Sequence, residues 1–173
     1  MSRITTENVA AAIRKVSSLS LPQKEELAGE IHRHQPNLLA SCLMQPKLGG
    51  HINDVEFLLN ILLVCYQAMK ESGLRWPMIT EYEQERQMQR WIGAVDFSEH
   101  ALSNGASNSA RQQYVDENPE QPLLAFVLNE TNQWLSARSQ RNGAGESDKF
   151  VIMASMNLVN CIASAPVPLT AHG

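Results

Sequence analysis

Three residues of this sequence could hold a metal ion: Glu26, Glu30 and His34, around the stretch EIHRHQP. On a helix, side chains four residues apart lie on one face, so these three line up. His32 cannot join them, because residues two apart on a helix point about 200° away from each other. A glutamate and a histidine at this spacing supply two ligands of the kind zinc accepts. A metal-dependent helical enzyme would still need a further ligand from elsewhere in the chain.

The same stretch has a simpler explanation as the end of a helix. Histidines in a last helical turn interact favourably with the carbonyl end of the helix dipole. A glutamate four residues before a cation is an ordinary surface pair. We favour this second explanation, so the sequence predicts no metal ion and no other cofactor.

A second group of residues has the composition of a binding surface. Tryptophan, tyrosine and arginine are enriched where proteins bind other molecules. Such residues gather around one predicted chain reversal and the helix that follows it: Arg75, Trp76, Tyr82, Arg86 and Arg90. A groove built from them would suit a peptide or an anionic ligand. In the alternative explanation, Trp76 precedes Pro77 and plugs the base of the bundle.

The remaining residues argue against catalysis. Cys42, Cys65 and Cys161 each lie within an apolar helical pattern and form no CxxC spacing. A thiol buried in such surroundings has a raised pKa and little reactivity. The chain also lacks a GxSxG motif, a phosphate-binding glycine loop and an HExxH motif. The sequence therefore favours a non-enzymatic protein.

Helical periodicity dominates the chain, with no convincing alternating strand. We predict an all-α fold, a single compact bundle of about six or seven helices with two apolar central helices, Ile52–Ser72 and Lys149–Ile162. The domain should span residues 1–163, followed by a flexible tail at 164–173. Residues 103–121 and 139–147 are polar and are predicted to be surface loops.

Capping residues predict where several helices begin and end. Ser20 and Gln23 have the spacing of a capping box, and the following helix should end near His34, before Pro36. Thr6 and Asn53 are expected to cap the first helix and the apolar helix.

Further boundaries are expected around residues 73–96. Gly73 is expected just past the end of the apolar helix, and Thr80 with Glu83 suggests a second capping box. The helix after it either continues through Gly93 or restarts at Asp96.

The charge distribution limits the partners. The net charge of −4 argues against broad attraction to nucleic acid or to anionic membranes. Residues 1–50 carry six Lys/Arg and four acidic residues, a net +2, so only this third could face phosphates. Weak nucleic-acid binding would depend on four of these cations: Arg14, Lys15, Lys24 and Arg33.

The sequence predicts a cytoplasmic protein. The first residues lack the apolar region of a signal peptide, and the longest apolar run is about half the length of a membrane span. Scattered cysteines in odd number also suit a reducing compartment.

The function that fits best is a non-enzymatic protein–protein interaction, adaptor or regulatory in kind. The partner is another protein or a second copy of this chain, as a homodimer. The alternatives are a metal-dependent helical enzyme and a weak nucleic-acid-binding regulator.

Overall fold

The computed structural model describes residues 1–44, 47, 51–100, 112–113, 115–142 and 148–167, and at 95–100 and 139–142 it describes the backbone alone. This part of the chain holds seven helices of eight residues or more and contains no strand, which confirms the all-α prediction. The helices are α1 (Thr6–Ser18), α2 (Leu21–His34), α3 (Pro36–Leu43), α4 (Ile52–Glu71), α5 (Glu81–His100), α7 (Gln121–Asn142) and α8 (Asp148–Ser164).

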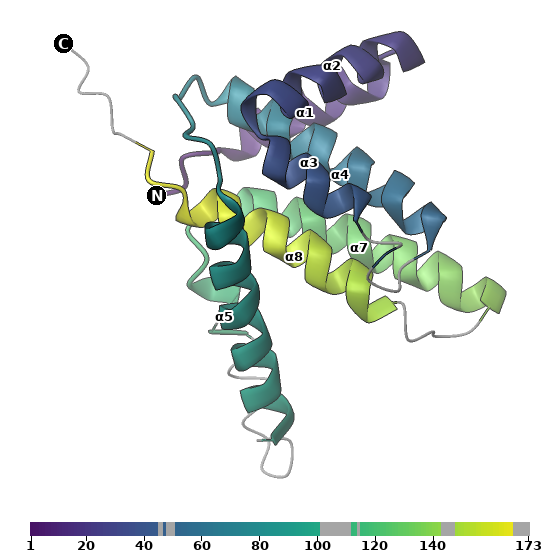
Figure 1. The fold of residues 1–173 in the computed structure, drawn as a ribbon, viewed down its shortest axis with the longest axis vertical. Coiled ribbons are helices and arrows are strands. Elements are labelled where there is room, and N and C mark those ends of the chain that lie inside the picture. Colours follow the sequence, from purple (N-terminus) through teal and green to yellow (C-terminus); the bar gives the residue numbers. More distant parts are fainter. Residues whose placement is uncertain (45–46, 48–50, 101–111, 114, 143–147, 168–173) are drawn as a thin grey trace.

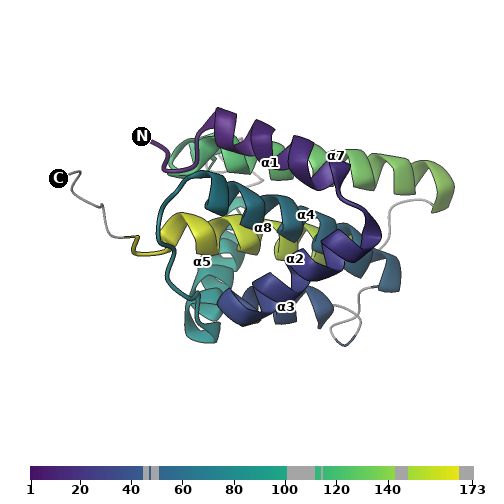
Figure 2. The ribbon, with the colours of Figure 1, turned by 90° about the horizontal axis from the view of Figure 1, so that it is seen from above.

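Helices α4 and α8 contact each other, and each also contacts at least three further helices. Helices α1 and α7 lie along one side of this pair, and α2 and α3 lie along the other (Figure 2). Most of the side chains of α4 are buried, from Asp54 to Met69 with few exceptions, and α8 is buried from Ser155 to Ile162. One hydrophobic cluster runs through the bundle, from Ile4 to Ala165.

Helix α4 is the one described helix that is long and apolar enough to cross a membrane. The bundle buries 67% of that stretch, as it would bury the core helix of a soluble protein. An apolar helix surrounded by other helices needs no polar face, which explains its composition.

The helix boundaries follow local capping, with two corrections. Ser20 and Gln23 form the predicted capping box, in which the Ser20 N–H donates to Gln23 Oε1 at 2.8 Å. The predicted caps Thr6 and Asn53 were each wrong by one or two residues. Thr5 caps α1, and His51 precedes α4, where its N–H donates to Asp54 Oδ2 at 2.8 Å.

The end of α4 and the start of α5 agree with the sequence. Gly73 follows α4 with a φ of 68°, a left-handed conformation that favours glycine. The Glu83 N–H donates to Thr80 Oγ1 at 3.1 Å at the start of α5. Helix α5 then continues through Gly93 to His100 without a break, which settles the choice that the sequence left open.

Helix α5 differs from the others in its position. It packs mainly against α8, and its second half extends beyond the other helices (Figure 1). Among the described helices, α8 is the main packing partner of α5.

An arginine near the amino terminus ties three distant segments together. The Arg3 Nε donates to Glu120 Oε1 at 2.7 Å, before α7. Its two other nitrogens donate to the carbonyls of Ile162, Ala163 and Ala165 at 2.6–3.0 Å, at the end of α8. Carbonyls in a last helical turn lack intrahelical partners, so a cation there is favourable.

Three predicted segments fall partly outside the described residues. In the loop predicted at 139–147, residues 139–142 instead continue α7, and residues 143–147 are not described. Of the loop predicted at 103–121, residues 112–113 and 115–116 are helical, and residues 101–111 and 114 are not described. Helix α8 ends at Ser164, at the start of the predicted tail, and residues 168–173 of that tail are not described.

Candidate functional site

The Glu30 and His34 pair binds a tyrosine of α4. The Tyr66 hydroxyl donates to Glu30 Oε1 at 3.1 Å, and His34 Nδ1 lies 3.0 Å from the same hydroxyl. Since that hydroxyl has one proton and gives it to Glu30, His34 Nδ1 is the donor to the hydroxyl oxygen. Lys70 completes the cluster, with its Nζ 2.8 Å from Glu30 Oε2.

The electrostatics of this cluster follow from its contacts. Burial acts to raise the pKa of Glu30, but hydrogen bonds from Lys70 and Tyr66 outweigh it and lower the pKa. Burial and the Glu30 charge raise the pKa of Tyr66 to about 12. The cluster therefore holds a carboxylate, a neutral phenol and an ammonium group together at neutral pH, an arrangement that ties α2 to α4.

The alternative metal site gains no support from this geometry. The residues of the described ranges form no group of three or more histidine, cysteine or acidic side chains that could hold a metal ion. Glu26 is exposed on α2, while Glu30 and His34 are both engaged with Tyr66.

The three cysteines are free and buried, at 0–1% exposure, in agreement with the sequence. Burial raises the pKa of Cys42 and of Cys161 to about 12, and raises that of Cys65 further. A thiol in this environment stays protonated at neutral pH, so none of the three is a nucleophile.

The five residues of the predicted binding surface lie in different surroundings. Trp76 packs at the base of the bundle, where its Nε1 donates to the Met69 carbonyl and to Ser72 Oγ at 3.0 Å. The Arg3 guanidinium lies 4.8 Å from the Trp76 ring. Arg75 beside it is exposed. Trp76 thus contributes to the architecture of the bundle in the way that the alternative explanation describes.

The other three residues lie together on α5. Tyr82, Arg86 and Arg90 recur every four residues, so they share one face of the helix. Tyr82 is 75% exposed, and Arg86 pairs with Glu83 at 2.8 Å. Met78, four residues before Tyr82, is 54% exposed. We call these four residues, Met78, Tyr82, Arg86 and Arg90, the α5 surface.

Glu83 is the centre of a hydrogen-bond network behind this surface. Its Oε1 accepts from Arg86, from Gln87 Nε2 at 2.7 Å and from Ser164 Oγ at 2.7 Å. Burial acts to raise the pKa of Glu83, but these hydrogen bonds and the charge of Arg86 lower it to about 2. The network joins the first turns of α5 to the end of α8.

The interface between α5 and α8 is unusually polar. Gln87, Asn157 and Asn160 are 3–7% exposed. Within the part of the chain that the structure describes, three buried polar atoms at this interface have no hydrogen-bond partner: Gln84 Nε2, Asn157 Oδ1 and Asn160 Nδ2. Each such atom costs about 1–3 kcal/mol, so this interface holds α5 less firmly than an apolar one would.

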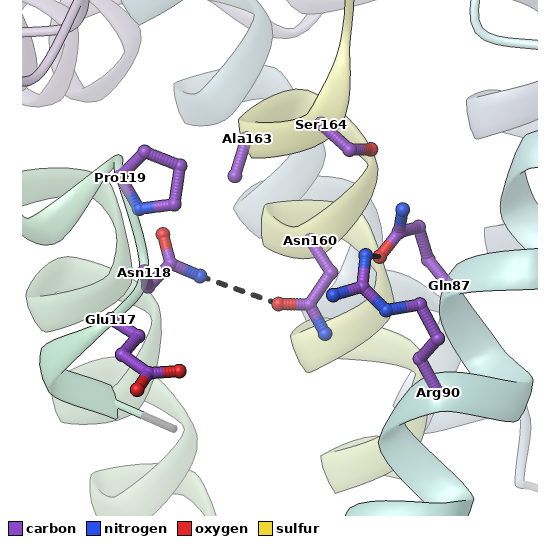
Figure 3. Close-up of a pocket in the computed structure, with 8 residues that line it drawn as sticks. All are labelled: Gln87, Arg90, Glu117, Asn118, Pro119, Asn160, Ala163 and Ser164. Carbon is purple, nitrogen blue, oxygen red and sulfur yellow. Dashed lines mark hydrogen bonds between the residues drawn. The ribbon is translucent and has the colours of Figure 1, made fainter. Parts of the chain in front are cut away.

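A cavity of about 240 Å³ opens at this interface. Gln87 and Arg90 of α5 form one wall, and Asn160, Ala163 and Ser164 of α8 form the back (Figure 3). The segment Glu117–Pro119, just before α7, closes the opposite side. The lining combines a guanidinium, a carboxylate and buried amides, so the cavity suits a small polar ligand.

The comparisons with known proteins add no relative. No protein-family model, no curated protein and no solved structure matches this chain. The class that the structure defines is an all-α bundle.

The sequence reasoning missed the asparagines of α8. Asn157 and Asn160 stand three residues apart within the otherwise apolar stretch MNLVNCI, so they share a helix face. Two amides on one face of a buried helix were a readable signal of a polar interface. The partner of Asn157 is Gln84 of α5, 73 residues earlier, and the partner of Asn160 is Asn118, 42 residues earlier, so only the fold brings them together.

Proposed function

We propose that this protein is a non-enzymatic interaction protein that binds another protein through the α5 surface. The observation that carries the proposal is the position of α5, which extends from the bundle and packs mainly on α8 (Figure 1). Tyr82 and Arg86 lie exposed on one face of α5, and Met78 is exposed in the segment just before the helix. Methionine, aromatic residues and arginine are the types enriched in protein interfaces.

Tyr82 is the expected centre of the contact. A tyrosine supplies a large, stiff contact area at low entropic cost, and at 75% exposure it has most of that area to bury. Arg86 lies one turn further along, and the Glu83 carboxylate holds its guanidinium in place. An arginine held in this way beside Tyr82 supports a preorganised contact.

The proposed location is the cytoplasm. Three free, buried cysteines are typical of a protein in a reducing compartment.

The test uses native mass spectrometry of the protein purified gently from its own host. We expect a complex with a partner protein, weakened in Tyr82→Ala by about 2 kcal/mol, roughly 30-fold in Kd. Leu21→Ala is the matched control, because Leu21 is 71% exposed at the start of α2, away from α5. A complex at twice the chain mass would identify a second copy as the partner. A complex that Leu21→Ala weakens as much as Tyr82→Ala would refute the assignment to α5.

A further inference from the structure

The hydrogen bonds around Asn160 leave one donor without a partner. The Glu120 N–H donates to Asn118 Oδ1 at 2.9 Å, so the amino group of Asn118 must face the other way. That amino group donates to Asn160 Oδ1 at 3.3 Å (Figure 3). The oxygen of Asn160 is thereby fixed, and its buried Nδ2 is a donor with no partner among the described residues.

An unpaired buried donor that lines an open cavity indicates a ligand acceptor. Asn160 is 4% exposed, so bulk water reaches its amide poorly. Arg90 lines the same cavity, and its guanidinium makes one long hydrogen bond, 3.5 Å to Gln87 Oε1, among the residues that the structure describes. A donor and a cation on one side of a cavity together suit a carboxylate, which accepts charge-assisted hydrogen bonds.

The opposite side of the cavity has the opposite charge. Glu117 lines it, and Figure 3 shows Asn160 between Glu117 and Arg90. Gln113 Nε2 donates to one Glu117 oxygen at 2.6 Å and holds the carboxylate in place. A carboxylate at this position repels a phosphate dianion and attracts an ammonium group.

We propose that this cavity binds a free α-amino acid, with its carboxylate on Asn160 Nδ2 and Arg90 and its ammonium group on Glu117. The volume of about 240 Å³ is below the 300–1,000 Å³ of pockets for drug-sized ligands and fits one amino acid. Ala163 and Pro119 offer a small apolar wall to the side chain. This site shares only Arg90 with the α5 surface, since its ligand lies between α5 and α8 and does not contact Tyr82 or Arg86 on the outer face of α5.

The bound amino acid would bridge α5, the segment before α7, and α8. A ligand that binds only the folded state raises the midpoint of thermal unfolding in a saturable way. The amino acid would also supply the acceptor that Asn160 Nδ2 lacks among the described residues.

The test is thermal unfolding followed by calorimetric titration of the full chain with the twenty standard amino acids. L-alanine is compared with propionate, which lacks its ammonium group, and with ethylamine, which lacks its carboxylate. We expect saturable stabilisation by at least one amino acid, and at least about tenfold weaker binding of the analogue that lacks either of its charged groups.

Three variants locate the site. Arg90→Met and Asn160→Asp should weaken amino-acid binding about ten- to hundredfold. Glu117→Gln should weaken the binding of alanine, whereas the binding of propionate should stay unchanged or become tighter. Arg75→Met is the control, because Arg75 is exposed and lies outside the cavity. Arg90 and Glu117 are exposed, so these two variants report on binding even if Asn160→Asp unfolds.

Two results would overturn the proposal. One is the absence of binding by every standard amino acid. The other is binding that does not depend on the charged groups, shown either by unchanged binding in Arg90→Met and Glu117→Gln or by propionate binding as tightly as alanine. Either result would leave the partner surface of α5 untouched, because that surface is tested by the mass of the complex.

Discussion

Replacing Arg3 by methionine tests the account of the fold most severely. Methionine keeps the apolar length of the side chain but removes four hydrogen bonds: one to Glu120 and three to carbonyls at the end of α8. It also removes the guanidinium over Trp76. The Glu120 side chain is 0% exposed, so Arg3→Met leaves a buried carboxylate without its cation.

The expected loss of folding stability in Arg3→Met follows from that buried charge. Breaking a buried ion pair by removing one partner costs about 3–5 kcal/mol. The Arg3 side chain is 19% exposed and the Ile4 N–H still donates to Glu120 Oε2 at 2.9 Å, so we expect the lower end, about 3 kcal/mol. The double variant Arg3→Met with Glu120→Gln removes the lone charge and should recover part of this loss.

The assay is urea unfolding followed by circular dichroism. Arg86→Met is the matched control, because the same substitution there breaks an exposed ion pair and should cost less than about 1 kcal/mol. A loss below about 1 kcal/mol in Arg3→Met would refute the reasoning. So would a double variant whose loss equals the sum of its two single variants, since coupled partners cannot be additive.

Three further predictions concern side chains with shifted pKa values or buried hydrogen bonds. The pKa of Glu83 falls from 4.5 to about 2 on folding, so its contribution to stability is present above pH 4.5 and is lost as the pH falls toward 2. In unfolding experiments at a series of pH values, the stability of Glu83→Gln should therefore fall less steeply over this range than that of the unchanged protein. The three cysteines should resist alkylation at pH 8 in the native protein and react fully in urea, and rapid labelling of the native protein would contradict their burial. Tyr66→Phe removes the hydroxyl shared by Glu30 and His34 and should cost about 1–3 kcal/mol in urea unfolding, whereas Tyr82→Phe at an exposed position should be nearly neutral.

Local patterns predicted the helices because those patterns act within a few residues. The Ser20–Gln23 capping box and the end of α2 before Pro36 depend on adjacent backbone groups, so both could be predicted from the sequence. The cap at His51 was missed because histidine is not among the preferred capping residues. The sequence did not decide whether α5 continues through Gly93, because one glycine inside a helix costs only about 1 kcal/mol and packing decides the outcome.

The candidate sites were less predictable because they join residues from different helices. The spacing of Glu30 and His34 was visible, but Tyr66, which binds both, is more than 30 residues away. The equal spacing of Tyr82, Arg86 and Arg90 was also visible, whereas the place of Trp76 under Arg3 depends on the whole fold. The cavity beside Asn160 requires three segments to meet, which no linear pattern reports.

The most direct test of the proposed function is site-specific photocrosslinking in the host cell. A photoreactive phenylalanine analogue replaces Tyr82 in one variant and Leu21 in another, two exposed positions on different helices. The account predicts one crosslinked product of defined mass from position 82 and none of that mass from position 21. The same product from both positions, or none from position 82, would contradict the claim that α5 binds a partner.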